Sequence, residues 1–400
     1  MDVVTLGMAR AEARKSLVRR PAPTVWKLGD SISANGFTAP TASADRVWSP
    51  DRDYLLWASI LSMGKIAYGG TAATGGFKTD QIIATHLPTV LAARPTFCVV
   101  HAGTNDIGTH TTAVTIANLK TIFDRLLAAG ITPVATTMLP KETNKGSSRE
   151  ALDAMSAFVT RYADLKGFPR VDWTTPFITT AGGWTGYASP TPGPYNYDDV
   201  HPEGGGAKVM GQALADVLTP LINTKPESLA TNTNYLADFV PTRVNGLLLT
   251  DTNADGVADQ ITAPAATGAV YALTAMSADE GKGNWQSMER TSTGSPTLET
   301  AAITVTPGDL ITFSCKVKTT GMKAGAATWH LRLTTSSVID VTALRNFKED
   351  ITLGLWKVTF RVPSTGVTNL KLHSYISAGT GKLFIGELNM VNLTAKGLDV

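Results

Sequence analysis

The chain has 400 residues, 43% of them hydrophobic, and a formal net charge of +2 at pH 7. This length exceeds what one ordinary hydrophobic core serves, so it predicts two globular domains. The nearly balanced charge provides no broad basic field and excludes a typical nucleic-acid-binding protein, and no apolar stretch is long enough to cross a membrane.

The N-terminal arm, residues 1–23, is basic and lacks the apolar segment of a signal peptide. Its alanine-containing middle predicts a short helix. Two interpretations stay open for the arm: a frayed terminus, and a segment that forms a homo-oligomer or docks the chain to a larger assembly.

Residues 24–223 alternate short apolar runs with helical patterns. The predicted strands are residues 25–28, 65–68, 96–101, 131–138 and 170–173, and the predicted helices are 51–63, 80–93, 112–129, 148–166 and 206–222. Strands that alternate with helices predict an α/β domain with a parallel sheet covered on both faces. Ligands of such sheets bind at the carboxyl ends of the strands.

The period of the pattern changes after residue 223. Residues 224–236 are rich in Thr, Asn, Pro and Ser and are predicted to be a linker. Residues 237–400 contain many runs of alternating polar and apolar residues, which predict an all-β jelly-roll sandwich. Within two of these runs Trp329 and Trp356 share a face with apolar residues, so we expect both in the core. Cys98 and Cys315 are predicted to be buried thiols in different domains, without a disulfide.

Chemistry-bearing residues occur in three short blocks near predicted strand ends. These are Gly29-Asp30-Ser31, Gly103-Thr104-Asn105-Asp106 and Asp198-Asp199-Val200-His201-Pro202. A serine nucleophile needs an adjacent base, and the base needs a partner that orients it. Ser31 is the predicted nucleophile and His201 the base. Asp198, three residues before His201, can fold back onto its ring, whereas the spacing of its rival Asp199 is one residue too short.

The oxyanion of an acyl-transfer intermediate needs preorganised donors. The predicted donors are the backbone N–H of Ser31, the backbone N–H of Gly76 and the side-chain amide of Asn105. Glycine at the second position lets the backbone approach a substrate closely. Gly70 and Gly75 remain alternatives to Gly76.

The order of these blocks resembles the SGNH, or GDSL, hydrolase superfamily over residues 24–223. The resemblance implies a flavodoxin-like three-layer fold and the hydrolysis of acyl esters. It implies Ser31 as nucleophile, His201 and Asp198 as the rest of the triad, and Gly76 and Asn105 in the oxyanion hole. This chemistry needs no cofactor.

An acidic loop opens the second domain. Asp251, Asn253, Asp255 and Asp259 place oxygen atoms at alternating positions around a glycine, as in loops that bind Ca²⁺. Thr262 stands where an EF-hand needs Glu, so an EF-hand is excluded. A structural Ca²⁺ site is one interpretation, and a metal-free turn is the other.

The second domain also resembles jelly-roll carbohydrate-binding modules. His330 and Arg332 lie on the polar face of one predicted strand, and His373 and Tyr375 lie on the polar face of another. These four residues together are the predicted carbohydrate-binding site, and an ordinary solvated sheet face is the alternative.

The combined features predict a serine esterase that removes O-acetyl groups from a polysaccharide. The alternatives are a lipid or small-ester hydrolase, and a non-enzymatic surface or tail adhesin. An acylated polysaccharide is the expected partner, without nucleic acid or membrane. A carbohydrate substrate combined with no signal peptide predicts an extracellular or virion-associated protein, such as a bacteriophage tail component, and a secreted enzyme whose leader has been removed is the other reading.

Overall fold

The computed structural model describes most of the two predicted domains. The described residues are 23–38, 44, 47–48, 51–140, 147–177, 198, 200–222, 249–281, 283–336, 340–364 and 366–395. The predicted linker, the predicted arm up to residue 22 and Asp199 lie outside this set. Within it, no helix combines the length and the apolar character that crossing a bilayer would require.

A five-stranded parallel sheet forms the centre of the first domain. Its order is β4-β1-β5-β6-β7, and all neighbours are parallel. The strands are β1 (Thr24–Gly29), β4 (Ala67–Ala73), β5 (Phe97–His101), β6 (Thr132–Thr136) and β7 (Arg170–Val171). If the five strands are numbered 1 to 5 along the chain, their order across the sheet is 2-1-3-4-5, which is the flavodoxin-like order. The predicted α/β fold is confirmed.

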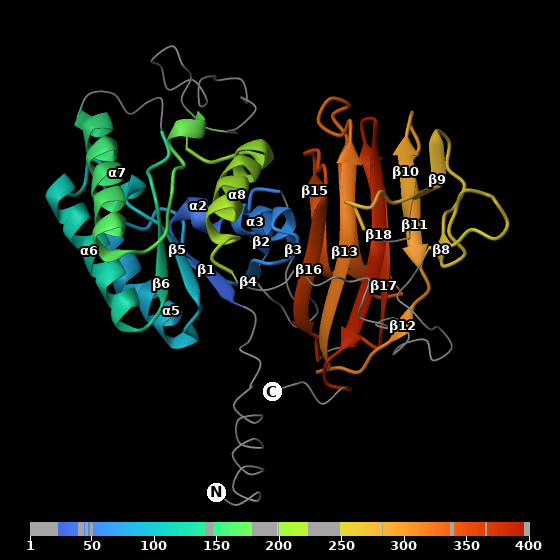
Figure 1. Cartoon of the computed structure of the whole chain (residues 1–400), viewed down its shortest axis with the longest axis horizontal. Coiled ribbons are helices and arrows are strands. Elements are labelled where there is room, and N and C mark those ends of the chain that lie inside the picture. Colours follow the sequence, from blue (N-terminus) through green and yellow to red (C-terminus); the bar gives the residue numbers. More distant parts are fainter. Residues whose placement is uncertain are drawn as a thin grey trace, which may run out of the picture.

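Helices cover both faces of this sheet (Figure 1). The outer layer consists of α5 (Leu87–Ala93), α6 (Thr112–Ala128) and α7 (Ser147–Lys166), and the inner layer of α3 (Tyr54–Leu61) and α8 (Gly204–Leu218). Each layer packs on the sheet through its own apolar cluster. Short elements among the described residues of this domain include α2 (Ser31–Ala34), α4 (Thr79–Gln81) and the 3₁₀ turns at Thr104–Asp106 and Thr175–Phe177.

The helix predicted over residues 80–93 is present and contains one irregular turn. A π-helical turn, Ile82–His86, separates α4 from α5. Pro88 explains the change, because proline has no N–H and its ring clashes with the carbonyl four residues earlier in a regular α-helix. The wider turn, closed by the Leu87 N–H on the Ile82 carbonyl, relieves this conflict.

The second domain is a β-sandwich, as predicted. One sheet has the order β16-β13-β18-β10-β9 and the other β15-β14-β17-β11-β8, with β12 on β17, and neighbours within them are antiparallel. The strands are β8 (Ile261–Thr262), β9 (Ala269–Ala275), β10 (Asn284–Arg290), β11 (Thr297–Thr300), β12 (Ile303–Thr304), β13 (Leu310–Thr320), β14 (Thr328–Thr334), β15 (Asp340–Phe347), β16 (Gly354–Arg361), β17 (Asn369–Ala378) and β18 (Gly381–Asn392). Trp329 and Trp356 are fully buried in its core, and Cys98 and Cys315 are buried free thiols, all as expected.

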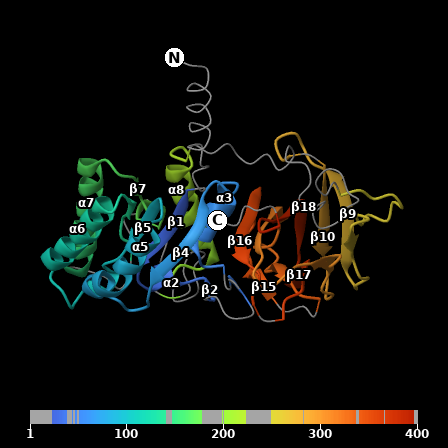
Figure 2. The ribbon, with the colours of Figure 1, turned by 90° about the horizontal axis from the view of Figure 1, so that it is seen from below.

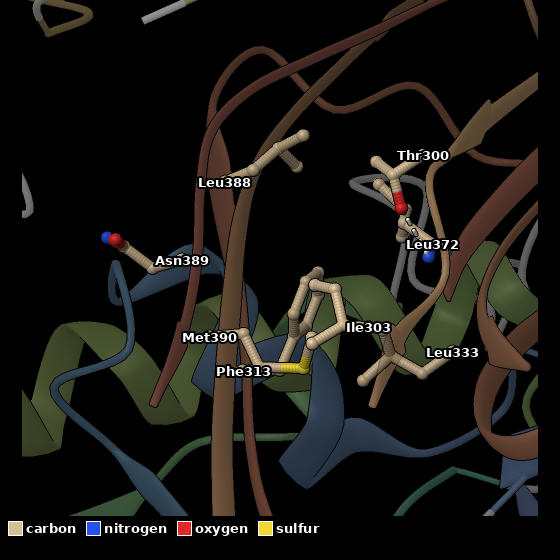
Figure 3. A pocket seen from close by; sticks show the side chains of 8 residues that line it. All are labelled: Thr300, Ile303, Phe313, Leu333, Leu372, Leu388, Asn389 and Met390. Atoms are coloured by element: carbon tan, nitrogen blue, oxygen red, sulfur yellow. Dashed lines mark hydrogen bonds between the residues drawn. The ribbon is translucent and has the colours of Figure 1, made fainter. Parts of the chain in front are cut away.

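A small cavity of about 20 Å³ lies inside the sandwich (Figure 3). Its lining residues are Thr300, Ile303, Phe313, Leu333, Leu372, Leu388, Asn389 and Met390. This volume holds one water molecule at most, so the cavity is a packing defect rather than a substrate site.

The two domains share a hydrophobic core. The strand β3 (Val47–Trp48), which β2 (Phe37–Thr38) joins, extends a sheet of the sandwich by pairing parallel with β15. Helix α3 lies between the parallel sheet and β16 (Figure 2). The ring of Trp57 lies 5.5 Å from that of Phe347, which lies 5.0 Å from that of Trp329. One apolar cluster therefore runs from α3 into the sandwich.

We expect Trp57→Ala to lower the free energy of unfolding by about 3–5 kcal/mol, the usual cost of deleting a buried Trp side chain. Trp57 is fully buried, and its indole N–H donates to the Asp51 carbonyl at 2.8 Å. Urea denaturation measures the change. Leu165→Ala is the control, because Leu165 is 76% exposed and should cost less than about 0.5 kcal/mol. Equal losses in both variants would contradict the shared core.

Candidate active site

Ser31 is the first residue of α2, directly beyond the carboxyl end of β1. Glycine precedes the turn because a Cβ on Gly29 would lie 2.1 Å from the His101 carbonyl oxygen. Asp30 caps the helix, and its carboxylate accepts the Ile32 N–H at 3.1 Å. The Ser31 N–H belongs to the first turn, whose amides have no partner inside a helix. The sequence thus builds a turn that presents both the hydroxyl and an amide donor at the sheet edge.

Asp30 is fully buried beneath this turn. Burial, together with the negative charge of Asp106, raises the pKa of Asp30 to about 7. Its hydrogen bond to Ile32 acts in the opposite direction. Asp30 is therefore a structural cap within the turn, whereas the exposed carboxylate of the site is Asp198.

His201 lies between Ser31 and Asp198. Its Nε2 is 2.8 Å from Ser31 Oγ, and its Nδ1 is 2.8 Å from an Asp198 carboxylate oxygen. A carboxylate only accepts hydrogen bonds, so a neutral His201 carries its proton on Nδ1 and offers Nε2 to the serine as an acceptor. The structure brings these three predicted residues together in the order that proton transfer from Ser31 requires.

Asp198 is held in an ionised form. Burial favours a higher pKa, but hydrogen bonds from the His201 ring and from the backbone N–H groups of His201 and Val200 outweigh it, so the pKa of Asp198 lies below its usual value. The two backbone bonds measure 2.7 Å each. This folding of the carboxylate onto the next three residues explains why the three-residue spacing suits an orienting acid.

The three candidate glycines occupy different places. Gly70 lies within β4, where a Cβ would be 2.7 Å from the Trp26 ring. Gly75 is next to the nucleophile, because a Cβ there would lie 3.7 Å from Ser31 Cβ. Gly76 is exposed, with a left-handed φ of +80° and open space around it. The loop at Gly75 and Gly76 therefore borders Ser31, and Gly70 serves the packing of the sheet.

Asn105 lies opposite this loop, in the 3₁₀ turn after β5. Its side-chain amide donates to the Phe77 carbonyl at 3.1 Å. Because an amide group carries two hydrogens, the second remains for another acceptor. Asn105 thus ties the Gly75–Phe77 segment to the end of β5.

Asp106 is a supporting residue that the sequence reasoning missed. It is buried and accepts the Thr79 N–H at 3.0 Å and the Thr115 hydroxyl at 3.3 Å. These bonds fix the loop after Gly76 against α6 and hold the Asn105 turn. Asp106 directly follows Asn105 in the Gly103-Thr104-Asn105-Asp106 block, and this position was the only sign of its role in the sequence.

The acidic loop of the second domain is closed by its own hydrogen bonds. Asp251 accepts the Gly256 N–H at 2.8 Å, Asp255 accepts the Val257 N–H at 2.8 Å, and Asp259 accepts the Thr252 N–H at 3.1 Å. Among the described residues, no group of three or more His, Cys, Asp or Glu side chains is placed to hold a metal ion. Calcium binding by Asp251, Asn253, Asp255 and Asp259 stays a prediction.

If the loop binds Ca²⁺, the melting temperature of the full chain should rise with free Ca²⁺ and fall when a chelator is added, because a ligand of the native state stabilises it. Differential scanning calorimetry measures both shifts, and Asp255→Asn should reduce them. Identical melting temperatures in Ca²⁺ and chelator would leave the loop as a metal-free turn.

The predicted carbohydrate-binding residues lie together on the outer face of β14 and β17. The rings of His330 and Tyr375 stack with centroids 4.0 Å apart, and the Arg332 guanidinium lies 4.8 Å from the Tyr375 centroid. Arg332 also pairs with Asp340 at 3.0 Å and bonds to His373 Nδ1 at 2.6 Å. Their grouping on one face is as the alternation predicts.

The alternative of an ordinary solvated face is wrong for this group. His330, Arg332 and His373 are only 4%, 7% and 9% exposed. Burial first, and then Arg332, lower the pKa of His330 to about 3 and that of His373 to about 4. Both rings are neutral at pH 7, which lets His373 Nδ1 accept from Arg332. The side chains bond to one another across strands instead of to water.

Comparisons with known protein families and solved structures find matches to about half of the chain. Residues 28–209 match the GDSL-like Lipase/Acylhydrolase family. No curated protein matches the chain in sequence. The matched residues span less than half of the chain and lie within the α/β domain.

Similar solved structures cover about half of the chain. A GDSL-like lipase of Bacteroides thetaiotaomicron is 20% identical, with 52% of this chain and 95% of that chain covered and a TM-score of 0.37. A lipase/acylhydrolase of Enterococcus faecalis is 17% identical, with 50% of this chain and 98% of that chain covered and a TM-score of 0.40. An acetylxylan esterase of Geobacillus stearothermophilus is 15% identical, with 48% of this chain and 93% of that chain covered and a TM-score of 0.35.

Proposed function

We propose that this chain, whose residues 28–209 match the GDSL-like lipase/acylhydrolase family, is a serine esterase that removes O-acetyl groups from a polysaccharide. The observation that carries the proposal is the alignment of Ser31, His201 and Asp198, with 2.8 Å on each side of the imidazole. A serine with a base and an oriented carboxylate is the minimal apparatus of acyl transfer.

In the proposed reaction His201 Nε2 accepts the Ser31 proton while Ser31 Oγ attacks the acyl carbonyl. The developing oxyanion is bound by the N–H groups of Ser31 and Gly76 and by the free amide hydrogen of Asn105. The protonated His201 then gives its proton to the leaving alcohol, and the acyl-enzyme is hydrolysed by a water molecule that His201 deprotonates. Asp198 holds Nδ1 throughout and stabilises the imidazolium.

The polymeric substrate is argued from access. Gly75, which borders the nucleophile, and its neighbour Gly76 are exposed, and Ser31 itself is half-buried. An edge built from glycines leaves room for an extended chain to approach with a small acyl group. Of His330, Arg332, His373 and Tyr375, only Tyr375 is not buried, so its ring is the proposed contact for the glycan, with the other three holding it in place. An extracellular or virion-associated setting is proposed together with such a substrate.

Acetate release tests this assignment. The full chain should release acetate from acetylated polysaccharides, and it should cleave p-nitrophenyl acetate faster than a long-chain p-nitrophenyl ester. A preference for the long-chain ester would instead support a lipid hydrolase. Binding of polysaccharide without cleavage of any ester would support the adhesin.

A further inference from the structure

The β15–β16 connection of the sandwich reaches the α/β domain at Asp51 and at α8, whose first residue follows His201 by three positions. Its backbone is fixed within the sandwich: Thr319 Oγ1 donates to the Glu349 carbonyl at 3.2 Å, and Asp350 accepts the Met322 N–H at 2.8 Å. Among the described residues, two hydrogen bonds join this segment to the other domain. Lys208 of α8 donates to the Asp350 carbonyl, and the Lys348 N–H donates to Asp51 at 3.2 Å.

Asp51 occupies the space between this segment and the start of α8. Its side chain is 2% exposed. A Cβ added to Gly204, the first residue of α8, would lie 2.3 Å from both Asp51 carboxylate oxygens, so the helix start rests directly on the carboxylate. The Asp51 carbonyl accepts the Trp57 indole N–H at 2.8 Å, which fixes Asp51 from the α3 side.

His201 precedes Gly204 by three residues, with only Pro202 and Glu203 between them. The position of the first turn of α8 therefore sets where the imidazole can lie. Glu203, the N-cap residue of α8, is also held from the same segment as Asp51, by Arg52 at 3.5 Å. The start of α8 thus connects His201, which precedes it in the chain, with Asp51, on which it packs.

We propose that Asp51 is a positioning residue, through which the β-sandwich holds the first turn of α8 and thereby keeps His201 Nε2 at hydrogen-bond distance from Ser31. The proposal rests on the esterase function argued above. It assigns to the sandwich a part in the reaction that is separate from glycan binding. A displacement of a catalytic group by about 1 Å can cost on the order of 100-fold in rate, so a buried support at this point matters.

The proposed support comes from the shape of Asp51 and from its acceptor oxygen for the Lys348 N–H. Burial, followed by the charges of Glu349 and Glu203, raises the pKa of Asp51 to about 7. Asn has nearly the same shape and keeps an oxygen acceptor for the Lys348 N–H. Ala leaves that N–H without its partner and opens space beneath Gly204.

The test uses the full chain and p-nitrophenyl acetate, at a temperature well below the melting point of every variant. We expect Asp51→Ala to lower kcat by about 10–100-fold with KM within about twofold, and Asp51→Asn to keep at least about half of the wild-type kcat. Hydrogen exchange should be faster in Asp51→Ala for the amides at the start of α8, a measurement that does not depend on activity.

Leu355→Ala is the matched control. Leu355 of β16 is buried at the same domain interface, against Gly64 of the α3–β4 connection. This variant should lose stability while keeping kcat within about twofold of wild type. A wild-type kcat in Asp51→Ala, or an equal loss of kcat in Leu355→Ala, would overturn the proposal. A wild-type chain that cleaves no ester would refute the esterase assignment instead, and unchanged exchange at the start of α8 would then refute the positioning role independently.

Discussion

Ser31→Ala should lower esterase turnover by roughly 10⁴–10⁶-fold, since members of a catalytic triad act as a unit and the loss of the nucleophile removes nearly all of their contribution. The substitution deletes one hydroxyl, which faces His201 Nε2 at 2.8 Å. The fold should be unchanged in circular dichroism. His201→Ala should cause a loss of similar size, measured as kcat for a chromogenic acetyl ester.

Ser33→Ala is the matched control for the nucleophile. Ser33 lies in the same short helix, but its hydroxyl bonds to the Tyr54 hydroxyl at 2.9 Å and not to the histidine. It should keep activity within a few-fold of wild type. More than a few per cent of residual activity in Ser31→Ala would rule out Ser31 as the nucleophile.

Asn105→Ala should lower kcat by roughly 10²–10³-fold, the usual cost of losing one oxyanion donor, with a smaller change in KM. The side chain also ties the Phe77 carbonyl to the turn after β5, so part of the loss reflects a looser Gly75–Phe77 segment. Asn105→Asp keeps the size of the side chain but has no donor when ionised, and it should be equally impaired. Steady-state kinetics separate the two parameters. A change confined to KM would assign Asn105 to binding of the ground state.

The parallel sheet and the positions of Ser31, Asn105 and His201 were predictable because they depend on local signals. Alternating strands and helices fix a parallel sheet, and the carboxyl ends of its strands meet at one edge. The Ser31 and Asn105 blocks directly follow β1 and β5 and must therefore converge, whereas His201 was recognised by its three-residue spacing from Asp198. The choice among Gly70, Gly75 and Gly76 was not predictable, because all three glycines lie in one short stretch and only the packing of Trp26 and Ser31 distinguishes them.

Helix α3 shows a different limit. Its sequence is apolar on every side, which is typical of a helix buried between two layers. The sequence predicts this helix over residues 51–63 but separates the two domains at the linker, residues 224–236. Tyr54, Leu55 and Ala58 pack on the parallel sheet, while Leu56, Trp57 and Ile60 pack into the sandwich. The composition of the helix indicated a second partner, but not which segment that partner was.

The burial of the polar side chains on β14 and β17 was not predictable for a similar reason. Alternation correctly placed His330 and Arg332 away from the core. Their burial depends on pairing across strands, such as Arg332 with Asp340 and His373, and this pairing follows from sheet register rather than from any one segment. Sequence patterns do not specify such register.

The pairing of β3 with β15 has a consequence for biosynthesis. Val47 aligns with Ala343 in that ladder, so β3 cannot pair with β15 until residues near the end of the chain have been synthesised. At 5–20 residues per second a ribosome needs roughly 15–60 s to cover this interval, during which Trp48 and Trp57 lack the surface that later covers them. During most of the synthesis of the chain, the nascent α/β domain therefore exposes an apolar surface that is prone to aggregation. The yield of the protein in cells should depend on chaperones that bind such surfaces.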